Sequence, residues 1–87
     1  MAVVLVKPQF EAPRDLVEKG GVIRDINTHL LVLHNFMEHA KKAGFVVAAL
    51  CRSPIEGTEG NREFLAQLQM QGAAIDEEII KAVVGMS

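Results

Sequence analysis

The chain has 87 residues, enough for one domain at most, since domains usually contain about 100–200 residues. Hydrophobic residues make up 49% of it, which excludes a disordered or low-complexity chain. The formal net charge of −2 gives none of the overall basic character that is typical of many nucleic-acid-binding proteins. The one cysteine, Cys51, excludes an internal disulfide and predicts a reduced, cytoplasmic location. No apolar run approaches the ~20 residues that a membrane-spanning helix needs.

The first expected element is a strand. Residues 2–6, AVVLV, form an unbroken apolar run rich in β-branched residues. Such a run predicts a strand buried on both faces of a parallel sheet, and Pro8 would end it because proline cannot donate to the sheet ladder. Residues 9–25 are polar and contain the adjacent pair Gly20 and Gly21, so they predict a long loop.

One long helix and a second strand follow. Asp25 is a favourable N-cap, Lys41 and Lys42 suit the negative end of the helix dipole, and Gly44 suits the C-terminal position. Between these signals the apolar residues recur every three to four positions: Ile26, Leu30, Leu33, Met37 and Ala40. Residues 45–50, FVVAAL, predict another buried strand.

The last part of the chain predicts a third strand and a short helix. Residues 53–61 contain two glycines, a proline and an asparagine and predict a loop, after which residues 62–70 largely alternate between apolar and polar. Acidic residues 76–78 open a short C-terminal helix with an apolar stripe, which Gly85 ends. The order predicts an α/β unit in which the first two strands are parallel and the third returns antiparallel.

Cations collect near the carboxyl ends of the two parallel strands. Six of the nine lysines and arginines lie in or beside the two loops that follow these strands: Lys7, Arg14, Lys19, Arg24, Arg52 and Arg62. Ligands of open α/β sheets bind at this edge, and phosphate contacts need a local cluster of cations rather than a positive total charge. An ordinary solvated loop surface remains an equally open interpretation.

Other residue types that carry chemistry offer weaker signals. His29, His34 and His39 are five residues apart, which turns them ~140° from one another around a helix, so they do not converge on a metal ion. We expect all three at surface or boundary positions. Cys51 has no histidine nearby in sequence, and we expect it to be a small buried hydrophobic residue.

Three separated segments resemble one protein family. The runs LVKPQFE (residues 5–11), KGGVIRD (19–25) and SPIEGTEGNREFL (53–65) are similar to the TlyA family, whose members are often named hemolysins and are related to FtsJ-like rRNA methyltransferases. The resemblance covers residues 2–70. It divides the chain into residues 1–70, the C-terminal portion of a methyltransferase domain, and residues 71–87, a helical tail without family signal.

The resemblance implies a fold and a chemistry. It implies a Rossmann-like sheet that uses S-adenosylmethionine, of which this chain supplies the last three strands, the final one inserted antiparallel between the other two. It also implies a Lys-Asp-Lys-Glu catalytic set, in which Lys7 matches the second lysine and Glu63 the last member. Lys7 would take or steer the proton of an rRNA ribose 2′-hydroxyl, while Glu63 would orient the lysines. Lys19, Arg24, Arg52 and Arg62 are the expected RNA contacts.

The chain also departs from the family pattern. The glycine-rich donor-binding loop, the first lysine and the aspartate would all precede residue 1. We therefore expect no cofactor-binding and no metal-binding residues in this chain, no appreciable binding of S-adenosylmethionine and no methylation by the chain alone. The missing N-terminal half of the domain becomes an expected partner.

Two functional hypotheses follow from these observations. The first is a fragment of an rRNA 2′-O-methyltransferase, and the second is a non-catalytic RNA-binding or oligomerisation module derived from that fold. Under either, an exposed sheet edge predicts a homo-oligomer. Membrane lysis, which the hemolysin names suggest, is disfavoured because the C-terminal helix is too short to span a membrane and begins with acidic residues.

Overall fold

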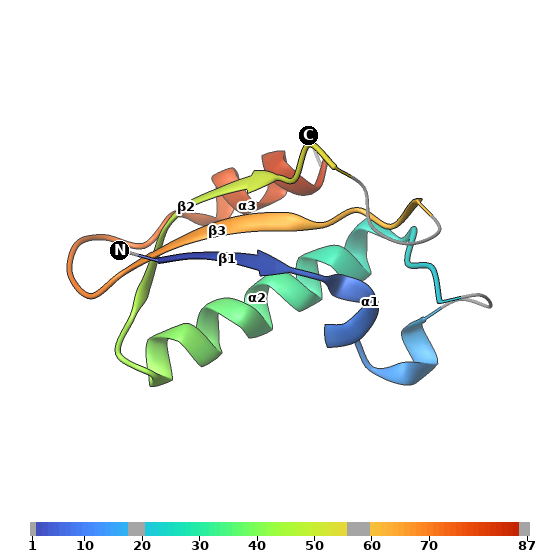
Figure 1. Cartoon of the computed structure of the whole chain (residues 1–87), viewed down its shortest axis with the longest axis horizontal. Coiled ribbons are helices and arrows are strands. Elements are labelled where there is room, and N and C mark those ends of the chain that lie inside the picture. Colours follow the sequence, from blue (N-terminus) through green and yellow to red (C-terminus); the bar gives the residue numbers. More distant parts are fainter. Residues whose placement is uncertain (1, 18–20, 56–59, 86–87) are drawn as a thin grey trace.

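The computed structural model describes residues 2–17, 21–55 and 60–85 and contains a three-stranded sheet with helices (Figure 1). The strands are β1 (Ala2–Val6), β2 (Val46–Arg52) and β3 (Phe64–Gln69). The helices are the short α1 (Pro8–Glu11), the long α2 (Ile26–Lys42) and the C-terminal α3 (Glu77–Val84), with a 3-10 turn at Arg14–Leu16.

The strand order in the sheet is β1-β3-β2, and β3 is antiparallel to both neighbours. Strands β1 and β2 therefore run in the same direction, as the sequence pattern predicted, and the last strand lies between them, as the family resemblance implied. Val6 is paired with Phe64 on one side of β3, and Arg52 is paired with Phe64 on the other. This register brings the ends of β1 and β2 to the start of β3.

The long helix α2 begins and ends at the predicted signals. The Asp25 carboxylate accepts a hydrogen bond from the Asn27 N–H at 2.8 Å, which satisfies one of the unpaired donors of the first turn. Gly44 has φ +90°, a backbone conformation that glycine adopts at low cost just after a helix. The N-cap and the C-terminal glycine are thus confirmed.

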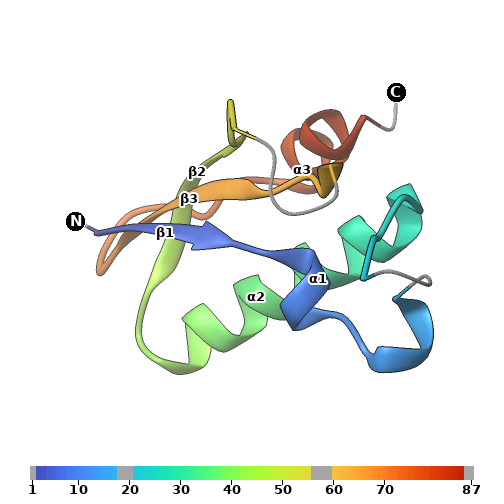
Figure 2. The same cartoon turned by 45° about the vertical axis from the view of Figure 1, so that its right-hand side comes forward.

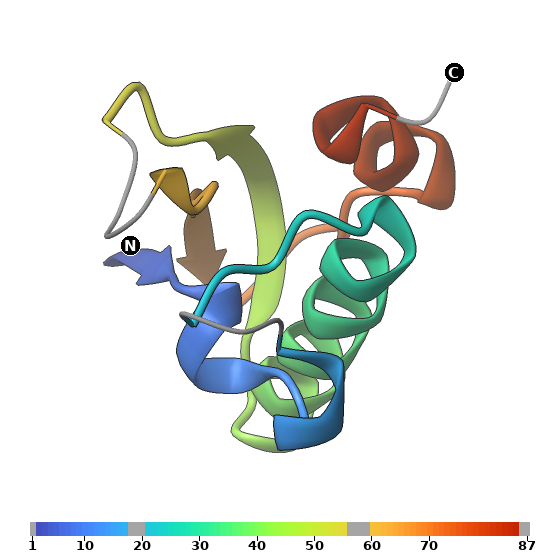
Figure 3. The same cartoon turned by 90° about the vertical axis from the view of Figure 1, so that its right-hand side faces the viewer.

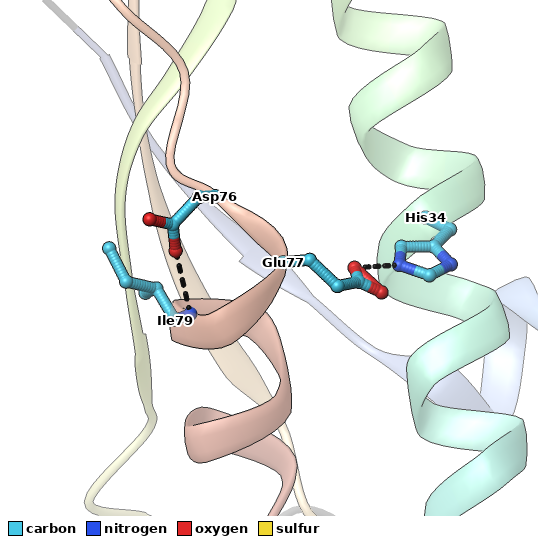
Figure 4. A network of polar contacts seen from close by, with 4 residues as sticks. All are labelled: His34, Asp76, Glu77 and Ile79. Carbon is cyan, nitrogen blue, oxygen red and sulfur yellow. Dashed lines mark hydrogen bonds and ion pairs between the residues drawn. The ribbon is translucent and has the colours of Figure 1, made fainter.

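The C-terminal helix α3 is capped in the same way and packs on α2. The Asp76 carboxylate accepts from the Ile79 N–H at 3.0 Å, and Gly85 ends the helix with φ +92°. His34 Nε2 of α2 lies 2.7 Å from the Glu77 carboxylate at the start of α3 (Figure 4). The predicted C-terminal helix is confirmed, and it is held against the rest of the structure.

Helices α2 and α3 cover the same face of the sheet (Figure 3). They enclose one hydrophobic core, formed by Val6, Val32, Leu33, Ala40, Val47, Phe64, Ala66, Ile80 and Val84. The side chains that alternate with these on the strands form the open face, which we define as Val3, Leu5, Ala49, Cys51, Leu65 and Gln67. A groove of about 240 Å³ runs along most of these residues.

Several expectations about burial and local structure are wrong. Strands β1 and β2 are not buried on both faces, because no helix among the described residues covers the open face, where Val3 is 66% exposed and Ala49 is exposed. Cys51 is exposed for the same reason. Residues 9–25 are not simply a loop, because the Phe10 and Glu11 amides donate to the Lys7 carbonyl and close the short helix α1.

Candidate functional site at the carboxyl ends of β1 and β2

The parallel strands β1 and β2 end at the same edge of the sheet, where α1, the segment before α2 and the segment before β3 also meet (Figure 2). Figure 3 faces this edge directly. Five of the six predicted site residues belong to described segments that reach this edge or border it. The sixth, Lys19, lies outside the described residues.

Lys7 directly follows Val6, and Glu63 directly precedes Phe64, which is the partner of Val6 in the sheet. Because Val6 is paired with Phe64 in the antiparallel register, the next positions in that register are Lys7 and Glu63. The backbone of Lys7 is still extended, with φ −113° and ψ 96°. On the other side, the Ser53 N–H donates to the Glu63 carbonyl at 2.8 Å. Lys7 and Glu63 are therefore the residues next to the last pair of the β1–β3 ladder, at one edge of the sheet.

The carboxylate of Glu63 is buried and takes its side-chain hydrogen bond from Gln9 rather than from Lys7. Gln9 Nε2 donates to Glu63 Oε2 at 2.7 Å. The Lys7 ammonium lies 5.8 Å from the centre of the Phe10 ring, within the range of a cation–π contact. Gln9 and Phe10 come from the first turn of α1, so this helix positions groups around both expected catalytic residues. Sequence reasoning missed Gln9, although it stands inside the family-like run LVKPQFE.

The expected RNA-contacting arginines do not share one environment. Arg52 Nε donates to the Val83 carbonyl at 2.8 Å, which pairs an otherwise unpaired acceptor in the last turn of α3. Arg24 and Arg62 instead line a cleft of about 400 Å³. The remaining described residues that line this cleft are Ile23, Ile26, His29 and Gly60. We call it the arginine cleft.

Asn61 fixes one wall of the arginine cleft. Its buried side chain accepts from the Ile23 N–H at 2.8 Å and donates to the Gly21 carbonyl at 2.9 Å. The segment before α2 is thereby joined to the segment before β3, and each carries one arginine of the cleft. The bonds of Asn61 to Ile23 and Gly21 could not be predicted from the sequence, in which Asn61 is marked only by its place in the run GNREF.

His29 forms the buried floor of the arginine cleft, which corrects the expectation of a surface or boundary position. It is 1% exposed, and Nε2 pairs with the Ile23 carbonyl at 3.1 Å. Its ring meets Phe64 edge-on at 5.7 Å between centroids. His29 precedes Leu33 by four positions, so both belong to the core-facing side of α2.

The environment of His29 disfavours its charged form. Burial is the main cause that lowers the pKa of His29 below its ordinary value of 6.5. The hydrogen bond to the Ile23 carbonyl opposes this effect, and the charges of Arg62 and Arg52 lower the pKa further. Because Nε2 faces a carbonyl acceptor, it carries the proton, and Nδ1 is left as an acceptor. Nδ1 is buried without a hydrogen-bond partner among the described residues.

The arginine cleft does not suit the sulfonium of S-adenosylmethionine, because its described lining has two guanidinium groups and no carboxylate. Within the described ranges, no group of three or more His, Cys, Asp or Glu side chains is placed to hold a metal ion. In the same part of the chain, no helix is both long and apolar enough to cross a bilayer.

Comparison with known proteins gives one consistent family. A sequence model of FtsJ-like methyltransferases matches residues 1–70. YqxC of Bacillus subtilis, whose name describes a candidate rRNA methyltransferase, is 41% identical over 85 residues, with 92% of this chain and 30% of YqxC covered. Hemolysin A of Brachyspira hyodysenteriae is 45% identical over 64 residues, with 74% of this chain and 27% of its own length covered. TlyA of Mycobacterium tuberculosis, a 16S/23S rRNA (cytidine-2′-O)-methyltransferase, is 33% identical over 69 residues, with 79% of this chain and 26% of TlyA covered.

Solved structures agree with the sequence comparison. A candidate hemolysin from Streptococcus thermophilus superposes with a TM-score of 0.83 at 42% identity, with 94% of this chain and 30% of that chain covered. One from Lactococcus lactis gives the same TM-score at 39% identity, with 94% of this chain and 40% of that chain covered. A match of that extent continues past residue 70 into the region of α3. This chain spans at most about 30% of the curated relatives that it matches.

Proposed function

Because the chain belongs to the FtsJ-like methyltransferase family, we propose that it is part of an S-adenosylmethionine-dependent rRNA ribose 2′-O-methyltransferase. In this proposal it supplies the last three strands of a Rossmann-like sheet, with Lys7 and Glu63 as catalytic residues. The observation that supports the proposal is the pairing of Val6 with Phe64, because Lys7 and Glu63 are the next residues beyond this pair at one sheet edge. The names of the rRNA methyltransferase relatives support RNA as the substrate, and an rRNA substrate agrees with the expected cytoplasmic location.

The chemistry assigned to Lys7 is transfer of a proton. A ribose 2′-hydroxyl is a weak nucleophile, and a positioned base accelerates its reaction by removing the proton as the new bond forms. The Lys7 amine, in its neutral form, takes or steers that proton. Glu63 is held by Gln9 and by the sheet, so its carboxylate can orient the ammonium that results. The methyl group comes from a donor that these residues do not hold.

The test of catalysis uses a longer protein of the same family in which the corresponding segment is replaced by this chain. Lys7→Ala should abolish 2′-O-methylation of rRNA while binding of S-adenosylmethionine changes little, because the donor is bound elsewhere in the domain. Lys41→Ala is the matched control, since Lys41 is an exposed lysine in the last turn of α2, away from the site. Full activity of the Lys7→Ala protein would overturn the assignment.

The chain by itself is proposed to be inactive. Titration of the 87-residue chain with S-adenosylmethionine in a calorimeter should give no binding at micromolar concentrations, because the glycine-rich donor-binding loop of the family pattern lies outside this chain. Micromolar binding would contradict the proposal that the donor site belongs to the missing part of the domain.

A non-catalytic oligomerisation module is the second candidate, and the open face favours it. Val3 and Leu5 are exposed apolar side chains on a sheet face that doubly wound folds normally cover. One experiment distinguishes the two candidates. If the chain is a methyltransferase segment, combining it with the remainder of a family domain restores methylation, whereas a non-catalytic module does not restore it.

A further inference from the structure

We infer that the arginine cleft binds a phosphate group, and that in the proposed function this group is a backbone phosphodiester of the RNA. The identification of the phosphate as RNA rests on the proposed function, whereas the binding of an anion does not. The inference separates Arg24 and Arg62, which line the cleft, from Arg52, whose Nε is bonded to the end of α3.

The first observation is the convergence of positive charge from distant parts of the chain. Arg24 comes from the segment before α2 and Arg62 from the segment before β3, and both side chains are exposed. Arg24 and Arg62 are both cationic and line one cleft, so an anion held in that cleft is attracted by both side chains.

The second observation is the floor of the cleft. His29 is almost completely buried, it lines the cleft, and its Nδ1 has no hydrogen-bond partner among the described residues. A buried polar atom without a partner is unfavourable. Nδ1 accepts a hydrogen bond, so it needs an N–H or O–H donor. When the cleft is filled, this donor would be a guanidinium or a water molecule that also donates to the bound phosphate.

The third observation is that the cleft is built by contacts that fix its shape. Asn61 bonds to both Ile23 and Gly21 and so sets the separation of the segments that carry Arg24 and Arg62. A volume of about 400 Å³ far exceeds the roughly 30 Å³ that one water molecule takes up in the liquid, so a phosphate with part of its sugar can enter. Guanidinium groups bind phosphate oxygens through paired N–H donors, which suits this lining.

Titration of the 87-residue chain with inorganic phosphate, followed by NMR, tests the anion site directly. Saturable shifts are expected at the Ile26 and Gly60 amides and in the His29 ring. Arg24→Gln and Arg62→Gln should each weaken phosphate binding by about tenfold or more, the ratio that corresponds to one charge-assisted hydrogen bond. Arg14→Gln is the control, because Arg14 is exposed on the 3-10 turn and does not line the cleft.

Two results of this titration would overturn the inference. One is the absence of saturation at these positions, and the other is an equal effect of Arg14→Gln, which would indicate general charge attraction or an adventitious ion only. If one glutamine variant fails to fold by circular dichroism, the other decides. Arg24→Lys, which keeps the charge but loses the paired donors, should bind phosphate with intermediate strength.

Binding of single-stranded RNA then separates this inference from the proposed function. Arg62→Gln should lower the slope of log affinity against log salt by about 0.7, the value for one phosphate contact on a single strand, and Arg14→Gln should not. Phosphate binding in the cleft without any RNA binding would leave the anion site standing and count against an RNA substrate. RNA binding that is unchanged in the Arg24 and Arg62 variants would refute the cleft as the RNA site.

Discussion

Asn61 holds the functional edge together at the scale of a single residue. Its buried amide accepts from the Ile23 N–H and donates to the Gly21 carbonyl, so both groups depend on one side chain. Asn61→Ala should lower the free energy of unfolding by roughly 1–3 kcal/mol, because it leaves the buried Ile23 N–H unpaired. Urea denaturation measures this loss. The control is Asn35→Ala on the exposed side of α2, and equal losses in the two variants would contradict the role of Asn61.

His29 makes stability depend on pH. Because burial and two arginines lower its pKa in the folded chain, the unfolded chain, with an ordinary pKa of about 6.5, binds the proton more readily at acidic pH. The free energy of unfolding is therefore unaffected by His29 above pH 6.5 and falls below it, by up to ~1.4 kcal/mol per pH unit.

Denaturation at pH 7.5 and pH 5.5 checks this sign. The drop in stability should be smaller in His29→Gln, which cannot titrate, than in the natural chain. His39→Gln, at an exposed position near the end of the same helix, should keep the full drop. A larger drop in His29→Gln would reverse the argument.

Residue-level prediction from the sequence depended on the kind of signal available. Lys7 and Glu63 stand in recognisable runs, so their chain positions at the sheet edge could be anticipated. The burial of His29 could have been read from its spacing to Leu33, but a histidine is polar enough to be assigned to the surface. Gln9 and Asn61 act through contacts between segments more than 35 residues apart, and no local pattern records such pairs.

Helix α3 tests stability at the scale of one element. Ile79 and Ile80 are adjacent in α3, yet Ile79 is 42% exposed and Ile80 only 3% exposed in the core. Ile80→Ala should cost about 2–5 kcal/mol of unfolding free energy, the usual range for emptying a buried aliphatic site. Ile79→Ala should cost much less. Similar losses measured by urea denaturation would mean that α3 does not pack on the core.

The elements themselves were largely predictable, because their ends carry chemical signals. Asp25, Gly44 and Gly85 occupy the terminal positions that the sequence indicated, whereas Asp76, expected in the first turn of the last helix, is its N-cap. Helix α1 was missed because it has four residues, too few for a periodic pattern, and depends on amides turning back to the Lys7 carbonyl. Strand pairing could be expected from the family resemblance, but the register of the pairing could be seen only in the structure.

At the scale of the whole molecule, the open face predicts self-association of the isolated chain. Apolar side chains on an uncovered sheet face, together with two edge strands, favour pairing with another copy. Leu5→Lys should shift the chain toward monomer in analytical ultracentrifugation. Leu16→Lys is the control, since Leu16 is exposed to a similar extent, 39% against 42%, but lies on the 3-10 turn. A natural chain that stays monomeric at high concentration would contradict this prediction.

The exposure of β1 shows why burial is hard to predict from the sequence of a partial domain. The run AVVLV has the composition of a strand covered on both sides, and in this chain helices cover only one side. A sequence pattern reflects the surroundings in which a strand is buried, including parts of a protein that are not in the chain at hand. The exposed apolar residues therefore agree with the proposal that this unit completes a larger domain.

The insertion of β3 between β1 and β2 has a consequence for synthesis on the ribosome. The first two strands do not pair with each other, so neither has a hydrogen-bonding neighbour in this sheet until residues 64–69 have left the exit tunnel. Glu63 directly precedes that strand and joins the edge in the same event. Completion of the sheet and arrival of the Glu63 carboxylate at Gln9 are thus a single late step, and a polypeptide released before it would have neither.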